Sequence, residues 1–142
     1  MTQEVWRPIT KYQGHKFDGR FEVSNWGNVR NRQTKMQQPF YTDNRGQGYY
    51  KFKLFDVEKN RVAIKVHRLV ALEFIGDGKG REVDHIDGNA NNNSFTNLRW
   101  VSHADNMRFW RKNENYTKSI VDVKEYGQVL LPFMREELKW SV

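Results

Sequence analysis

The sequence predicts an α+β fold: a small β-rich amino-terminal region, then a strand–loop–strand–helix unit and a short carboxy-terminal tail. Two patterns carry this prediction. Residues 48–56 and 61–66 alternate apolar and polar side chains, as half-buried strands do, whereas residues 66–75 have apolar side chains at helical spacing. The 142 residues suffice for one ordinary domain. Aliphatic residues are few beside nine Phe, six Tyr and five Trp, which indicates a core dependent on aromatic rings.

The amino-terminal region contains FEVSNWGNVRNR (residues 21–32), which predicts two short strands around Asn25-Trp26-Gly27, because Asn and Gly suit the dihedral angles of a tight turn. A hairpin follows, in which the polar VEKN joins GYYKFKLFD (residues 48–56) to RVAIKV (residues 61–66). A two-stranded ribbon with basic side chains fits the width of a DNA major groove. The cations expected on its solvent face are Lys51, Lys53, Arg61 and Lys65.

A helix is predicted for VHRLVALEFI (residues 66–75), ending at the glycines of GDGKG. His67 lies beside its apolar stripe, where a histidine is more often structural than catalytic. The stripe consists of Val66, Leu69, Val70 and Phe74.

The segment 81–112 has the order strand, loop, strand, helix. REVDHID and LRWV are the strands, and the Asn-rich GNANNNSFTN between them is too polar to enter a core. Ser102 opens the helix, with Asp105 three positions later at the spacing of a capping box. We expect Met107 and Trp110 to form the buried stripe of this helix.

The composition excludes several classes of protein. Without cysteine there is no disulfide framework, no thiol nucleophile and no Cys-based zinc or iron–sulfur site. No run approaches the roughly 18 apolar residues of a membrane span. The amino terminus MTQEVWRPITKY lacks the apolar region of a signal peptide, so we expect a soluble intracellular protein.

The net charge of +7 is concentrated in one part of the chain. The first 75 residues carry 14 Lys and Arg against 7 Asp and Glu, whereas the rest is neutral overall. Such an excess gives the segment a positive field and favours a nucleic-acid partner, although scattered cations can also be simply solvated. Arg30 and Arg32 are further candidates for DNA contacts.

The candidate chemistry lies in Asp84-His85, Asn97 and Asn106. An imidazole can take a proton from water near neutral pH, and carboxylate and amide oxygens suit Mg²⁺ or Mn²⁺. Together these groups are suited to hydrolysing a phosphodiester. The alternative is that the Asn residues only shape turns and cap themselves.

These residues stand in a recognisable string. VDHIDGNANNNSFTNLRWVSHADN resembles the ββα-metal motif of phage HNH homing endonucleases, and KVHRLVALEFI resembles the segment that commonly precedes it. VWRPI followed by FEVSNWGNVRNR resembles the NUMOD4 module fused to such nucleases. The resemblance covers roughly residues 5–112.

The resemblance implies a role for each site residue. His85 would be the general base that activates water, and Asp84 and Asn106 would bind one divalent ion. Asn97 would fix the loop between the two strands. Many relatives have His where this chain has Asn106, and an oxygen ligand there favours Mg²⁺ or Mn²⁺. The four-cysteine zinc staple of some relatives is missing, so packing around Trp100, Met107 and Trp110 must hold the motif.

Two points stay open. Successive side chains of a strand point to opposite faces, so a shared site for Asp84 and His85 requires a twist or bulge. The residues alone would instead pair His85 with Asp87, which remains a substitute ligand. His103, at the start of the helix, is either a phosphate contact or a surface residue.

The resemblance also divides the chain. Residues 1–60 would be a NUMOD4-like DNA-binding region, residues 61–115 the HNH nuclease domain and residues 116–142 an extension. Pro132 suits a helix start, which predicts a short helix over 133–140.

We therefore expect a site-specific, metal-dependent endonuclease of phage origin. It would bind double-stranded DNA as a monomer, nick one strand and need no small-molecule cofactor, acting in the cytoplasm of a bacterial host. The alternatives are a catalytically silent DNA-binding regulator or inhibitor, and a nonspecific defence or toxin nuclease.

Overall fold

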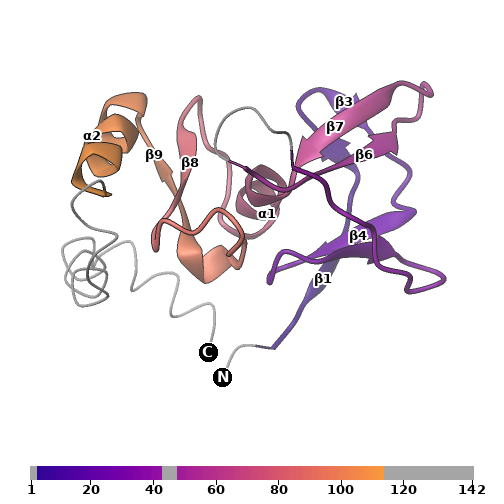
Figure 1. Ribbon diagram of the computed structural model, residues 1–142. Helices are drawn as coiled ribbons and strands as arrows, with labels where there is room; N and C mark the ends of the chain where they lie inside the picture. Colours follow the sequence, from indigo (N-terminus) through magenta and orange to yellow (C-terminus); the bar gives the residue numbers. More distant parts are fainter. Residues whose placement is uncertain (1–2, 43–47, 114–142) are drawn as a thin grey trace.

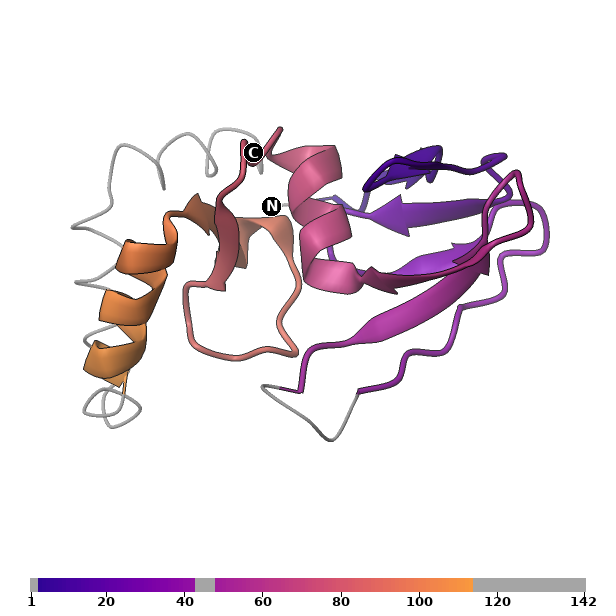
Figure 2. The same cartoon turned by 90° about the horizontal axis from the view of Figure 1, so that it is seen from above.

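The computed structural model describes residues 3–42 and 48–113. Helix α1 (Val66–Phe74) lies in the middle of the molecule. The amino-terminal strands and a long hairpin lie on one side of α1, and the strand–loop–strand–helix unit lies on the other (Figures 1 and 2). The α+β prediction is confirmed.

The amino-terminal strands are short. In the described residues, β1 (Trp6–Pro8), β4 (Phe21–Ser24) and β5 (Val29–Asn31) form an antiparallel sheet with β4 in the centre. The strands β2 (Lys11–Tyr12) and β3 (His15–Lys16) form a small ribbon. The two strands predicted around Asn25-Trp26-Gly27 are β4 and β5, whereas β1, β2 and β3 were not predicted. Two or three residues are too few to show a period.

The predicted hairpin is present as β6 (Lys51–Phe55) and β7 (Arg61–Lys65), paired antiparallel with Phe52 opposite Ile64. Its apolar face is buried as expected, because Phe52 and Ile64 are fully inaccessible. Asp56 shapes the connection by accepting hydrogen bonds from the backbone N–H groups of Glu58 and Asn60.

Helix α1 buries the predicted stripe, with Val66, Leu69 and Val70 fully inaccessible. Val66 was also expected to end the strand before it, but it is the first residue of the helix. The helix ends where the amide of Gly76 donates to the carbonyl of Ala71, and Gly76 has a φ of 135° that a side chain would oppose.

The third unit has the predicted order. It consists of β8 (Glu82–His85), the 3₁₀ turn η1 (Phe95–Asn97), β9 (Leu98–Val101) and α2 (His103–Asn113). Ser102 caps α2, because its Oγ accepts from the amide of Asp105 at 3.1 Å. The expected buried position of Met107 is wrong, since this residue is 45% exposed.

The loop between β8 and β9 is less exposed than expected. Asn93, Phe95 and Asn97 are buried, which contradicts the view that this segment is too polar for the interior. Burial of an amide is tolerated when its hydrogen bonds are satisfied within the protein, and both amides have protein partners.

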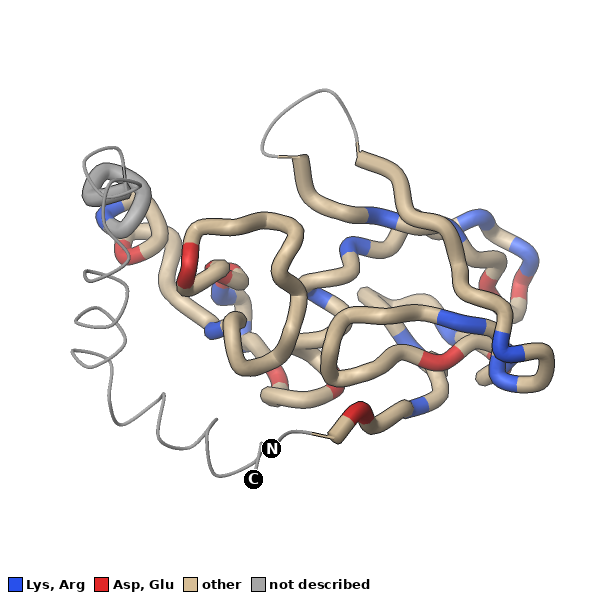
Figure 3. Tube along the Cα trace, turned by 60° about the horizontal axis from the view of Figure 1, so that its bottom comes forward, with Lys and Arg blue, Asp and Glu red and all other residues tan. Residues whose placement is uncertain are grey.

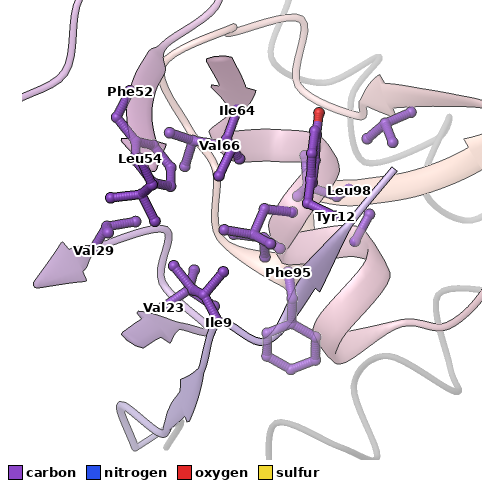
Figure 4. Packing of buried hydrophobic residues seen from close by; sticks show 14 of the residues in the cluster. Ile9, Tyr12, Val23, Val29, Phe52, Leu54, Ile64, Val66, Phe95 and Leu98 are labelled. Atoms are coloured by element: carbon purple, nitrogen blue, oxygen red, sulfur yellow. The ribbon is translucent and has the colours of Figure 1, made fainter. Parts of the chain in front are cut away.

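One buried cluster joins the parts of the molecule. Figure 4 shows side chains of the amino-terminal strands, the hairpin, α1 and the η1–β9 segment facing one another. Aromatic rings contribute to it as expected, although aliphatic residues outnumber them. The buried rings are Tyr12, Phe17, Phe52, Phe95 and Trp100. Other aromatic side chains are exposed, such as Trp26 and Phe55.

The proposed boundary at residue 60 falls inside the β6–β7 hairpin, so pairing across it links the two regions. The extension 116–142, with its predicted helix over 133–140, lies outside the described residues. In the described part of the chain, every helix is too short or too polar to span a membrane.

Candidate active site

His85 is the last residue of β8 and is buried among aromatic rings. Its ring stacks on Tyr49 with centroids 5.7 Å apart and an interplanar angle of 16°. The ring of His67, from α1, lies 5.1 Å from it. Burial lowers the pKa of His85, although its hydrogen bond to Asn93 acts in the opposite direction. The neutral imidazole, which can accept a proton, is therefore favoured.

Asn93 determines which nitrogen of His85 accepts that proton. The Nε2 atom of His85 lies 2.8 Å from Oδ1 of Asn93. Because a carbonyl oxygen only accepts, Nε2 must carry the hydrogen, and the lone pair of the neutral ring is then on Nδ1. Asn93 was not predicted as a site residue, because it is one of several Asn residues in the same loop.

Asp84 has different surroundings. Its Oδ2 accepts hydrogen bonds from Nε and Nη2 of Arg99 at 2.8 and 2.7 Å, and both side chains are buried. Burial raises the pKa of Asp84, and the Arg99 guanidinium opposes this effect. Arg99 lies directly opposite Asp84 on β9, so aligning the two predicted strands would have identified this partner.

Asn106 lies over the same face of β8 as Asp84. Its Nδ2 donates to Oε2 of Glu82 at 2.6 Å, and residues 82 and 84 share a face because they are two positions apart. His103 contacts the other oxygen of Glu82 at 2.7 Å while remaining 76% exposed. The hydrogen bonds from Asn106 and His103 lower the pKa of Glu82. Glu82 was not predicted as a site residue, although it alternates with Asp84 in EVDH.

The donor set on this face fits a hard cation. Asp84 and Glu82 offer carboxylate oxygens, and the Nδ2 contact to Glu82 leaves the amide oxygen of Asn106 as a ligand atom. In the described residues, groups of three or more His, Cys, Asp or Glu that could hold a metal are absent. An ion bound here would therefore need Asn106, and water or a substrate phosphate would complete its coordination.

Asn97 lies in the connection between β8 and β9. Its Nδ2 donates to Oδ1 of Asp87 and to the carbonyl of Asn92, both at 2.9 Å, and its Oδ1 accepts from the amide of Asp87 at 3.0 Å. These bonds hold the two sides of the loop together. Asp87 also accepts from Asn92 and from the amide of Asn89, so its carboxylate is occupied within the loop.

The expected bulge between Asp84 and His85 is absent from the strand pairing. The register runs through consecutive pairs from Glu82 opposite Val101 to His85 opposite Leu98. Asp84 and His85 therefore face different surroundings, as alternation requires. The two groups still interact electrostatically, because the Asp84 carboxylate acts to raise the pKa of His85.

The basic side chains of the hairpin lie on its outer face. Lys53, Arg61 and Lys65 are exposed, and Lys51, which is half-buried, lies directly opposite Lys65. Lys53 also lies 5.5 Å from the centre of the Tyr41 ring. Figure 3 shows Lys and Arg positions distributed over the amino-terminal strands and this hairpin, with acidic positions between them.

Arg30 and Arg32 are held by a buried carboxylate. Nε of Arg30 lies 2.6 Å from Glu22, and Arg32 and Lys35 each approach Glu22 to 3.8 Å. The Arg30 guanidinium also stacks 3.7 Å above the Trp6 ring. Because three cations surround the single carboxylate of Glu22, the surface formed by these four residues has a net positive charge.

Two families match the chain in the order that the sequence suggested. Residues 4–55 match the NUMOD4 motif, and residues 65–108 match the HNH endonuclease family. Among the solved structures, one described as DNA binding and cleavage by the HNH homing endonuclease I-HmuI is similar, with a TM-score of 0.62 and 31% identity. That similarity covers 87% of this chain and 66% of the other.

Two curated proteins with similar sequences are also endonucleases. DNA endonuclease I-HmuI of Bacillus phage SP01 is 39% identical over 107 residues, which is 72% of this chain and 55% of that protein. The uncharacterized HNH endonuclease L247 of Acanthamoeba polyphaga mimivirus is 34% identical over 108 residues, or 74% of this chain and 25% of that protein. The chain thus spans about half the length of the phage relative and a quarter of the length of the mimivirus relative. It belongs to the HNH endonuclease family, with a NUMOD4 motif ahead of the HNH segment.

Proposed function

We propose that this chain is a metal-dependent DNA endonuclease that hydrolyses a phosphodiester bond. The observation that carries the proposal is the pair of neighbouring residues in β8. The hydrogen bond to Asn93 gives His85 a defined tautomer. Next to it in β8, Asp84 interacts electrostatically with His85 and, together with Asn106, offers hard oxygen ligands.

In the proposed mechanism, His85 takes a proton from the attacking water at Nδ1, because Nε2 is engaged by Asn93. Asp84 and Asn106 would hold one Mg²⁺ or Mn²⁺ ion. When bound, that ion supplies positive charge to the phosphate and to the leaving 3′ oxygen. Arg99 keeps the Asp84 carboxylate in place through two hydrogen bonds. Asn97 fixes the loop that carries Asn93.

The proposed substrate is double-stranded DNA, read by the region 1–60 and cut by the region 61–115. The hairpin carries basic side chains on its outer face and leads directly into α1. We propose that one monomer nicks one strand at a specific site inside a phage-infected bacterium, without a small-molecule cofactor. The proposed DNA contacts are Arg30, Arg32, Lys51, Lys53, Arg61, Lys65 and His103.

Cleavage of supercoiled plasmid with Mg²⁺, with and without EDTA, tests this function. The proposal predicts discrete nicking that requires the metal. Binding without cleavage would favour a silent regulator or inhibitor. Degradation of any DNA at many positions would favour a nonspecific nuclease.

A further inference from the structure

The turn between β4 and β5 reaches across the molecule to the loop that carries Asn93. The carbonyl of Asn25 accepts a hydrogen bond from the amide of Phe95 at 2.8 Å. Beside it, Gly27 packs so tightly that a Cβ atom there would lie 2.7 Å from Cβ of Asn93 and 3.0 Å from its carbonyl oxygen. Residues about 70 positions apart thus make a direct backbone contact.

The turn itself is held firmly. Oγ of Ser24 accepts from the amides of Trp26 and Asn28 at 3.2 and 3.1 Å. The Asn25 side chain is tied to the amino-terminal segment, because its Oδ1 accepts from the amide of Val5 at 2.8 Å. Gly27 has a φ of 87°, which glycine adopts without strain. A turn held in this way can restrict the position of the loop that packs against it.

The turn packs against Asn93, the residue that orients His85. Asn93 is 4% exposed, and its side chain forms the 2.8 Å contact with Nε2 of His85. Asn93 lies on a loop, away from the β8–β9 pairing, so the strands do not set its position. Asn97 holds the neighbouring carbonyl of Asn92. The amino-terminal turn adds support through the packing of Gly27 on Asn93 and the bond from Phe95 to Asn25.

We infer that the turn Ser24–Gly27 of the NUMOD4 segment is a positioning element for the catalytic histidine and acts through Asn93. This inference rests on the proposed role of His85. It implies that the amino-terminal region does more than hold DNA, because it also sets the tautomer and orientation of the general base. Removing the support should lower the rate of cleavage without weakening binding.

The matched variants are Gly27→Ala and Gly14→Ala. Both glycines are in tight turns of the amino-terminal region with positive φ, 87° and 83°, so the backbone strain is similar. A Cβ at Gly14 meets no atom within 4 Å, whereas one at Gly27 displaces Asn93. We expect kcat to fall about 10- to 100-fold in Gly27→Ala, with the Kd for DNA unchanged. Gly14→Ala should retain the wild-type kcat.

A second variant avoids the steric clash. Ser24→Ala removes the side-chain oxygen that holds the turn and leaves Gly27 in place. Ser24→Ala should also lower kcat, but by a smaller factor than Gly27→Ala. Asn93→Ala should lower kcat as much as Gly27→Ala, and the double variant should be no worse than either. The exposed Asn91, changed to Ala, is the control on the same loop.

A spectroscopic measurement separates this inference from the proposed function. The ¹⁵N chemical shifts of the His85 ring report the tautomer without any cleavage. We expect hydrogen on Nε2 in the wild type and in Gly14→Ala, and a mixture of tautomers in Gly27→Ala and Asn93→Ala. If the wild type does not cut DNA but these shifts change as expected, the proposed function fails and the positioning stands. The inference would be overturned if folded Gly27→Ala kept the wild-type His85 shifts and the wild-type kcat. It would also be overturned if kcat fell equally in Gly14→Ala.

Discussion

Replacing His67 by Phe should make the stability of the protein less dependent on pH. His67 is 6% exposed, and its Nδ1 is buried without a hydrogen-bond partner among the described residues. Burial, followed by the neighbouring His85 and nearby cations, lowers the pKa of His67 from 6.5 to about 3. The folded protein therefore keeps this ring neutral, whereas the unfolded chain protonates it below pH 6.5.

The sign and size of the effect follow from this difference in proton binding. Between pH 6.5 and 3 the unfolded state binds more protons, so stability falls as the pH falls. From pH 6 to pH 4, His67 alone should remove about 2 to 3 kcal/mol from the free energy of unfolding. Carboxylates that titrate in the same range, such as Glu82, add to the loss in both proteins. The prediction therefore concerns the difference between wild type and variant.

Urea unfolding at half-unit steps from pH 7 to pH 4 measures this difference. Tyr49→Phe is the control, because it changes a ring 4.4 Å from His67 but removes no group that titrates below pH 7. It should keep the wild-type slope, while His67→Phe should be flatter by more than 1 kcal/mol per pH unit near pH 5, about the limit set by one proton. Parallel curves for wild type and His67→Phe would refute the neutral, buried assignment.

Three further predictions concern metal, DNA and product. Asp84→Ala and Asn106→Ala should raise the Mg²⁺ concentration needed for half-maximal cleavage before activity is lost, which a metal titration measures; an unchanged requirement would place the ion elsewhere. Changing Lys51, Lys53 and Lys65 together to Ala should weaken DNA binding and flatten its salt dependence, since each phosphate contact adds roughly 0.9 to the slope; an unchanged slope would show that the hairpin faces away from DNA. Plasmid assays should accumulate open circles before linear product while sedimentation reports a monomer, and direct linearisation or a stable dimer would contradict nicking by one copy.

The parts of the fold with a clear period were predictable from sequence. The β6–β7 hairpin and α1 followed from alternation and from helical spacing, and both are present. The strands β1, β2 and β3 were missed because they have two or three residues each. Met107 was wrongly expected to be buried. The helical pattern does not show that α2 lies at one end of the molecule (Figure 2), where Met107 is exposed.

The candidate site was predictable only where a residue type indicates its chemistry. Asp84, His85 and Asn106 stood out as candidate ligands and base, but the residues that contact them did not. Arg99 requires the strand register, and Asn93 looks like any other Asn in a polar loop. The contact of Gly27 with Asn93 is a long-range consequence of tertiary packing that local patterns do not encode.

The most direct test of His85 as the general base is single-turnover cleavage by His85→Ala, with DNA binding measured in parallel. General-base catalysis typically contributes about 10² to 10⁴ in rate, and the proposed DNA contacts lie on other residues. We predict a loss of cleavage of this order in Mg²⁺ with the Kd for DNA nearly unchanged. Cleavage at the wild-type rate by His85→Ala would contradict the assignment of His85 as the base.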